Sequence, residues 1–277
     1  MATRSAWWSA VARGGVEGDG TERSRVPRPP HACSSVGARD GGVSTIAARA
    51  NYPIELSGRS RVISLLYSIL LASGVSRVRF ADRHWRPLIS DLDIGFGPIT
   101  AEDLGGNFYD LCNSQRRQLS LLPIAADARY EAATDKPLLA IHYGEYDPEQ
   151  VIEWSYKGIA HCVIHAPIGD EIVVGPLVLP GKSPCNRCLS LYEFDNFGFS
   201  TAERIPLTAL DDLPAAASHY VAAILASQVL HFIDSQSSDA SVNRNTGVGE
   251  ITYINFQRLT EPQVVAIPRH PLCGCDR

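Results

Sequence analysis

Two short cysteine pairs, separated by about ninety residues, constrain this chain more than any other feature. Cys185 and Cys188 lie in the run SPCNRC, and Cys273 and Cys275 lie near the C-terminus. Each pair presents two sulfur ligands with little rearrangement of the backbone, and four converging thiolates form a closed structural zinc site. The alternative is that some of the four are buried free thiols, since cysteine is among the most buried residue types. The zinc hypothesis predicts that the end of the chain is held against its middle.

Composition restricts the classes of protein that remain. A chain of 277 residues with 45% hydrophobic and 20% charged residues can form one large α/β domain or two small ones. The formal net charge of -5 argues against general nucleic-acid binding. Three further cysteines, Cys33, Cys112 and Cys162, make an odd total of seven, which fits a reducing compartment. We therefore expect a cytoplasmic protein, and no apolar run approaches the roughly 20 residues of a membrane span.

The first fifty residues mix glycine, serine, proline and arginine without periodicity. We therefore expect residues 1–50 to be a largely disordered tail and residues 51–277 to form the folded domain. Trp7 and Trp8 are the exceptions, because they could anchor a contact with a partner. A start codon assigned too far upstream is the other explanation for this tail.

A strand–helix–strand unit of about thirty residues opens the expected domain. Residues 52–56 are a strand candidate, apolar residues follow helical spacing from 62 to 73, and residues 76–82 form a second strand that ends in Asp82. This is the shape of the first half of a nucleotide-binding fold, in which glycines after the first strand let the backbone approach phosphates. Only Gly58 stands at that turn.

Two interpretations of this turn stay open. Arg59 and Arg61 flank the end of the turn and could attract an anion. Their side chains would also fill the space that a phosphate needs, so the fold could have kept its shape while the pocket closed.

Strands and helices alternate along the rest of the chain. Hydrophobic patterning predicts strands at residues 136–142, 160–165 and 171–178, helices starting near 147 and spanning 214–233, and a closing antiparallel pair at 249–259 and 263–267. The sequence therefore predicts an α/β fold: a mostly parallel, Rossmann-like sheet with helices on both faces, a C-terminal antiparallel extension and a zinc knuckle.

The segments around the cysteine pairs resemble a known superfamily. Residues 174–189 (VGPLVLPGKSPCNRCL) and residues 270–275 (HPLCGC) look like the ThiF/MoeB superfamily of ubiquitin-activating-enzyme-like proteins. They are most similar to the divergent bacterial branch associated with azole-modified peptide biosynthesis. The resemblance extends over about residues 52–277.

This resemblance implies a nucleotide site. Catalytic members use ATP to adenylate the C-terminal carboxylate of a peptide or small protein. Carried over one at a time, Asp82 matches the acid that binds ribose, Gly58 the glycine turn, Arg116 or Arg117 the downstream cation and Asp147 the magnesium ligand.

The chain also departs from the family pattern. The run SDLD at residues 90–93 stands where the family has Ser-Asn-Leu-Asn followed by arginine, so Asp91 replaces an amide and Ile94 replaces the arginine. A carboxylate at such a position repels a triphosphate. The resemblance therefore implies a degenerate nucleotide site, and no catalytic residue is assigned.

Two classes of function remain. The first is a zinc-stapled, non-catalytic scaffold that holds a precursor peptide or docks a YcaO-type cyclodehydratase. The second is an ATP- and magnesium-dependent adenylyltransferase, which could feed sulfur transfer through Cys112 or Cys162. A nicotinamide or flavin oxidoreductase would leave the cysteine pairs without a purpose. The family resemblance also implies homodimers that pair across the edge of the sheet, and a leader-binding N-terminal domain that residues 1–50 are too short and too polar to form.

Histidines and aromatic residues near these motifs complete the candidates. His142, His161 and His165 lie in or beside apolar strands, where a hydrogen-bonded core histidine is the usual outcome. The ring of His270 is expected to donate to a thiolate of the zinc site, and ligation by His270 itself is the less favoured variant. An aromatic run after the first cysteine pair either forms an exposed loop that covers a peptide or a second subunit, or packs against the knuckle. Its members are Tyr192, Phe194, Phe197 and Phe199.

Overall fold

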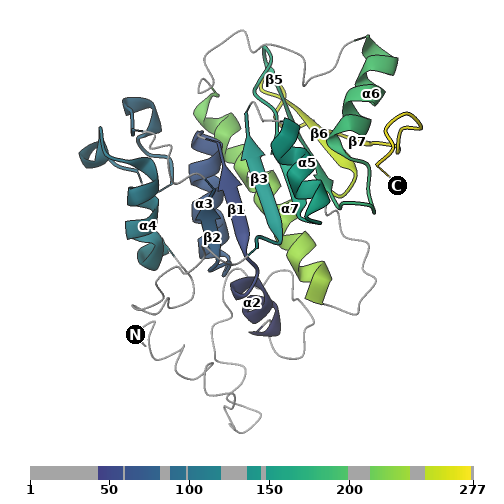
Figure 1. Ribbon diagram of the computed structural model, residues 1–277. Coiled ribbons are helices and arrows are strands. Elements are labelled where there is room, and N and C mark those ends of the chain that lie inside the picture. The colour runs from purple at the N-terminus through teal and green to yellow at the C-terminus, as the bar shows by residue number, and fades with distance from the viewer. Residues whose placement is uncertain are drawn as a thin grey trace, which may run out of the picture.

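The computed structural model describes residues 43–58, 60–81, 88–97, 99–119, 136–144, 148–198, 213–237 and 247–275. These residues form a seven-stranded sheet in the order β2-β1-β3-β4-β5-β6-β7, with helices on its two faces (Figure 1). The strands are β1 (Ile54–Ser57), β2 (Val78–Phe80), β3 (Leu139–Tyr143), β4 (Ala160–Ile164), β5 (Glu171–Val178), β6 (Glu250–Asn255) and β7 (Gln263–Ala266). The helices are α2 (Val43–Ala50), α3 (Arg61–Ala72), α4 (Phe108–Leu119), α5 (Pro148–Tyr156), α6 (Asn186–Phe197) and α7 (Ala215–Ser237), with short 3₁₀ turns at Asp91–Asp93 and Ala101–Asp103.

The sheet is parallel in one half and antiparallel in the other. β2, β1, β3 and β4 run parallel, whereas β4–β5, β5–β6 and β6–β7 are antiparallel pairs. The predicted parallel sheet is therefore correct for the first four strands, and the antiparallel closing pair is confirmed. β5 is a correction. A parallel connection needs a dozen or more residues, and the short link between β4 and β5 permits only a reversal of direction.

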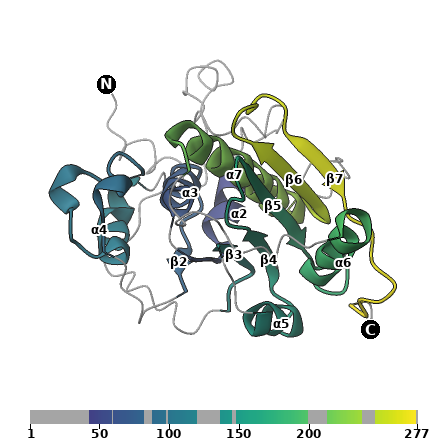
Figure 2. The same ribbon diagram turned by 90° about the horizontal axis from the view of Figure 1, so that it is seen from above.

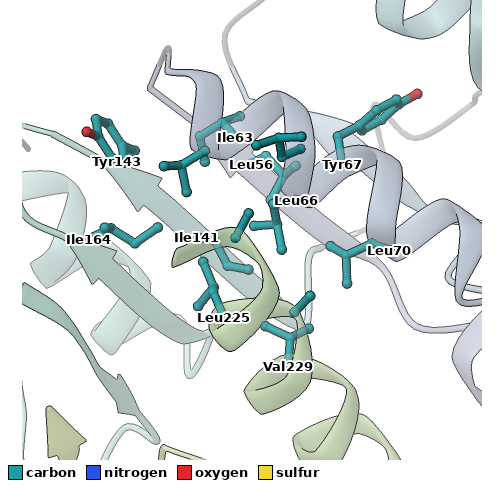
Figure 3. Close-up of a cluster of buried hydrophobic side chains, with 14 of the residues drawn as sticks. Leu56, Ile63, Leu66, Tyr67, Leu70, Ile141, Tyr143, Ile164, Leu225 and Val229 are labelled. Atoms are coloured by element: carbon teal, nitrogen blue, oxygen red, sulfur yellow. The ribbon is translucent and has the colours of Figure 1, made fainter. Parts of the chain in front are cut away.

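The main core lies between the sheet and the layer formed by α3 and α7. Alternate residues of β1, β3 and β4, such as Leu56, Ile141 and Ile164, point toward Leu66 of α3 and Leu225 of α7 (Figure 3). α3 begins where Ser60 caps it, with the N–H of residue 63 donating to Ser60 Oγ at 3.2 Å. This cap fixes the helix directly after the β1 turn, as the sequence pattern predicts.

The opposite face of the sheet carries α5 and α6 (Figure 2). Trp154 and Val151 of α5 pack on Ala140 and Val163 of the parallel strands. α6 packs on β5 and β6 through a separate cluster that contains Cys188, Leu189, Val173 and Ile251. α4 lies on the β2 side of the molecule and contacts α3. The sequence analysis predicted neither α4 nor α6.

α2 changes the expected N-terminal boundary. Residues 43–50, which the sequence analysis assigned to the tail, form this helix, and its Arg49 is buried against Asp234 of α7 at 2.7 Å. Apolar residues are too sparse before residue 50 for periodicity to reveal the helix, and its partner lies 185 residues away. The remainder of the tail prediction, including Trp7, Trp8 and Cys33, falls outside the described residues.

By length and composition alone, α7 could cross a membrane, because the window Ala215–Gln236 is long and apolar enough. Half of that window is buried inside the fold, where Val221, Leu225 and Val229 belong to the main core. Its apolar character is therefore that of a core helix.

Candidate functional site

The four predicted zinc ligands meet in space. The sulfur atoms of Cys185, Cys188, Cys273 and Cys275 all lie within 4.8 Å of one another. Cys185 Sγ lies 3.9 Å from Cys188 Sγ and 3.3 Å from Cys273 Sγ, and Cys188 Sγ lies 3.5 Å from Cys275 Sγ. These distances exclude disulfide bonds, whose sulfur atoms are about 2.05 Å apart. They match the edge of about 3.8 Å of a tetrahedron with zinc–sulfur bonds of about 2.3 Å.

Two elements position these sulfur atoms. Cys185 is the N-cap of α6 and Cys188 lies one turn later, so the helix presents both on one side. The segment after β7 supplies the other pair, and the N–H of Cys273 donates to the carbonyl oxygen of His270 at 3.0 Å in a tight turn. The chain end is thereby held against the middle of the chain, as the cysteine spacing predicts. The site fits a divalent, thiophilic metal ion.

The electrostatics of the cluster also favour a cation. Burial raises the pKa of Cys188, but hydrogen bonds from the backbone of His270 and Cys185 and from the neighbouring thiols outweigh burial and leave that pKa below its usual value. Burial and the adjacent sulfur atoms raise the pKa of Cys273, and raise that of Cys275 to about 11. Four thiols this close cannot all ionise without a positive charge among them, and a bound metal supplies that charge.

His270 supports the cluster by a different atom from the one expected. Its backbone N–H donates to Cys188 Sγ at 3.4 Å, whereas its ring bonds to Asp195 of α6. The N–H of Leu272 donates to His270 Nδ1 at 3.2 Å, so Nε2 carries the proton that is donated to Asp195 Oδ2 at 2.9 Å. The imidazole therefore fastens the C-terminal turn to α6.

A second candidate site lies where the sheet order reverses. β1 has β2 on one side and β3 on the other, and in open α/β sheets ligands bind outside the carboxyl ends of strands at such a point. Gly58 lies at this edge with φ of 79°, and a Cβ there would lie 2.2 Å from the carbonyl oxygen of Tyr143. The missing side chain therefore makes room for the backbone of Tyr143, the last residue of β3.

The neighbouring polar groups at this edge bond to one another. Ser57 and His142 are register partners on β1 and β3, and Ser57 Oγ lies 2.8 Å from His142 Nδ1. Arg61 donates to the carbonyl oxygen of Leu213 at 3.0 Å, and its guanidinium lies 4.9 Å from the centre of the Phe96 ring. Arg61, which the sequence suggested as a ligand for an anion, thus binds groups of the protein itself near the start of α7.

The structure does not bring Arg116 to Gly58. Its guanidinium donates to the carbonyl oxygen of Ser76, which precedes β2 at the amino edge of the sheet, whereas Gly58 lies at the carboxyl edge. Asp93 accepts hydrogen bonds at 2.8 Å from both the N–H and the hydroxyl of Ser90, so this carboxylate caps its own 3₁₀ turn. The run at 90–93 therefore has a local structural role.

Several predicted residues fall outside the described residues. They are Asp82, Asp147, Arg59 and Phe199, together with the side chain of Arg117.

The two cysteines considered for sulfur transfer are both core residues. Burial raises the pKa of Cys112 and of Cys162, to about 12 for the latter. A thiolate is the reactive form of cysteine, so burial makes both unsuitable as sulfur carriers.

Histidines and aromatic residues divide between core and surface. His161 is buried beside Trp154 and its Nδ1 bonds to the carbonyl oxygen of residue 159, as expected for a core histidine. Of the aromatic run, Tyr192 packs against the cluster beneath α6, whereas Phe194 and Phe197 are exposed. Packing against the knuckle is therefore confirmed for Tyr192, whereas Phe194 and Phe197 are exposed on a helix and not on the expected loop.

Comparisons with known proteins identify the fold only through solved structures. No protein-family model and no curated protein matches the chain. Escherichia coli MccB with AMPCPP and MccA is similar with a TM-score of 0.64 at 15% identity, over 97% of this chain and 77% of MccB. MccB with ATP is similar with a TM-score of 0.60 at 17% identity, over 86% of this chain and 69% of MccB. PaaA is similar with a TM-score of 0.55 at 17% identity, over 81% of this chain and 66% of PaaA.

The chain shares the fold of MccB and PaaA. At these identities the likeness carries the arrangement of the elements and nothing about the reaction. The sequence analysis missed two features of the sites: Asp195, which fixes His270, and the Ser57–His142 pair. The sequence gives no sign of either contact, because each joins segments that lie more than 70 residues apart in the chain.

Proposed function

We propose that this chain is a zinc-stapled, non-catalytic ThiF-like scaffold that serves a YcaO-type cyclodehydratase and its precursor peptide in modified-peptide biosynthesis. The observation that carries this proposal is the backbone contact at Gly58. In a phosphate cradle, the first turn leaves its N–H groups open to the ligand. Here the Tyr143 carbonyl oxygen lies where a Cβ on residue 58 would stand, so a partial negative charge adjoins the start of that turn.

The charges around this edge support the same proposal. ATP-dependent adenylation depends on cations that hold the phosphates and neutralise charge in the transition state. Arg61 is directed to Leu213 and Phe96, and Arg116 lies at the opposite edge of the sheet. The zinc ligands, in contrast, are assembled with good geometry.

The link to peptides comes from the structural neighbours. MccB is described as a microcin C7 biosynthetic enzyme and has been solved with the peptide MccA. A shared fold at low identity supports a related context for this chain and leaves open which step it serves.

The alternative function is an adenylyltransferase, which is favoured by the fold that this chain shares with MccB bound to ATP. In that case Asp82 would bind the ribose and Asp147 the magnesium ion. Asp82→Asn would then abolish nucleotide binding, whereas Asp110→Asn on the exposed side of α4 would not.

Calorimetry of the zinc-loaded protein with ATP and magnesium separates the two functions. We expect no binding and no peptide-dependent exchange of labelled pyrophosphate into ATP. Reconstitution then tests the scaffold: adding this chain should raise the rate at which the YcaO-type enzyme dehydrates its precursor, followed as a mass loss of one water per ring. ATP binding that Asp82→Asn removes would reject the scaffold in favour of the enzyme.

A further inference from the structure

The outward side of α6 is unusual for a surface helix. α6 buries Cys188 and Leu189 on one side, and its opposite side carries two large apolar side chains. Phe194 is 57% exposed and Phe197 is 54% exposed. They lie three residues apart, which places them next to each other on the helix.

Two more α6 residues extend this side of the helix. Arg187 lies seven residues before Phe194, which is almost two full turns, so both point the same way. Leu191 lies between them and is half-buried. Arg187, Leu191, Phe194 and Phe197 together are called the α6 stripe.

Positive charge gathers at the start of this stripe. Lys182 and Arg187 are exposed and lie in the segment that enters α6. Arg269 donates from its guanidinium to the carbonyl oxygen of Gly181 at 2.8 Å, which brings a third cation beside Lys182. The chain as a whole carries a formal charge of -5, so this group of cations differs in sign from the average surface.

The zinc-held C-terminal turn borders the other side of the stripe. The Asp195–His270 contact fastens this turn to α6, and both views show it beside the helix (Figures 1 and 2). Leu272 in this turn is 75% exposed. The turn that Asp195 and His270 fasten to α6 therefore carries an exposed apolar residue.

We propose that the α6 stripe, with Lys182, Arg269 and Leu272 at its margins, binds an extended peptide that carries acidic residues next to large apolar residues. Cations at one end attract carboxylates, and the phenylalanines offer apolar area to leucine-like or aromatic side chains. Arg187 and Phe197 are ten residues apart, so the stripe spans about 15 Å. An extended segment of about five residues covers that length.

This inference rests on the proposed function, because it names where a scaffold would hold its peptide. It concerns binding alone and involves neither ATP nor the cyclodehydratase. A chain that binds peptide on α6 and also binds ATP would overturn the scaffold and leave this site intact.

The test starts from a random 12-residue peptide display library selected on the zinc-loaded full-length protein. Enriched peptides are synthesised with a fluorescein label and their Kd values are measured by fluorescence anisotropy. We expect enriched peptides that combine Asp or Glu with Leu, Phe or Trp, and binding that weakens as NaCl is raised. Phe194→Ser with Phe197→Ser should weaken binding at least tenfold, and Arg187→Glu should weaken it most for the most acidic peptides.

Matched variants control for nonspecific effects. Ile152→Ser with Tyr156→Ser removes an even more exposed apolar pair from α5, where the two side chains are 66% and 93% exposed. Arg258→Glu reverses an exposed cation elsewhere. Both should leave the Kd unchanged, and all variants should retain one equivalent of zinc.

Three outcomes of the peptide experiments would overturn the proposal. They are a library that enriches no peptide, peptides without the acidic and apolar pattern, and peptides that bind the double serine variant as tightly as the parent. A fourth is a dimer by light scattering that the same variant converts to a monomer, since the stripe would then join two copies of the chain.

Discussion

At the carboxyl edge of the sheet, the absence of a side chain at Gly58 allows β1 and β3 to approach each other closely. Its φ of 79° disfavours any other residue, and its missing Cβ also makes room for the carbonyl oxygen of Tyr143. Strain and steric overlap thus act at the same residue, and both are independent of any ligand.

Gly58→Ala should therefore destabilise the protein more than a glycine substitution that meets only the backbone strain. Gly105 is the matched control, because its φ is 74° and a Cβ there meets nothing within 4 Å. We expect Gly105→Ala to cost about 1 kcal/mol. Gly58→Ala should cost about 1–3 kcal/mol more because of overpacking. Urea denaturation of both variants measures the difference, and equal losses would show that the Tyr143 contact is unimportant.

His165 makes the stability depend on pH. Burial, together with a smaller effect of the neighbouring His142, lowers its pKa to about 4. In the unfolded chain the pKa returns to about 6.5, so below that pH the unfolded state binds more protons than the folded state. Stability is therefore complete above pH 6.5 and is lost as the pH falls toward 4.

His165→Gln tests this linkage. Between pH 7 and pH 5 the wild-type protein should lose about 2 kcal/mol more stability than the glutamine variant. Protonation of the zinc thiolates affects both proteins alike and cancels in the comparison. Denaturant titrations at several pH values give the two slopes, and parallel slopes would contradict the buried neutral histidine.

Among the elements, α2 is attached to the fold by the buried side chain of Ile46 and by a buried ion pair. Arg49 donates to both carboxylate oxygens of Asp234 on α7, at 2.8 and 2.7 Å, and to the carbonyl oxygen of Ser73 at the end of α3. One side chain thus joins three helices. Loss of one partner leaves a buried charge without its counter-ion, which is more damaging than losing both.

Arg49→Met should cost about 3–5 kcal/mol, because Asp234 keeps its burial and loses its cation. The double variant Arg49→Met with Asp234→Leu should recover most of that loss. Thermal unfolding of the two single variants and the double variant gives the coupling energy between the residues. Additive effects would mean that the pair contributes nothing specific to the attachment of α2.

At the scale of the whole molecule, the two halves are held by different means. α3 and α7 cover the parallel strands with a continuous apolar core. α6 and the C-terminal turn rest on a smaller cluster in which the cysteines themselves take part. A metal ion bound by these cysteines would therefore contribute a larger share of stability to this part of the molecule than to the main core.

Removal of zinc with a chelator should loosen that half alone. Hydrogen exchange followed by mass spectrometry should accelerate in peptides covering residues 185–198 and 263–275, and remain slow in peptides from α3 and β3. Cys188→Ser should reproduce the effect without chelator, whereas Cys112→Ser should retain the metal. Uniform acceleration along the chain would show instead that the staple supports the entire fold.

The sequence by itself determined those elements that a local pattern of residues is enough to predict. Apolar alternation fixed β1, β3 and β4, helical spacing fixed α3 and α7, and the two cysteine pairs fixed the metal site, because each pair needs only a short turn to present its ligands. Only the tertiary structure decided that the Tyr143 carbonyl oxygen lies against Gly58, that Arg116 lies at the amino edge of the sheet, and that Phe194 and Phe197 are exposed. These depend on which distant segments pack together, and contacts between backbone atoms of separate strands leave no periodic signal in either segment.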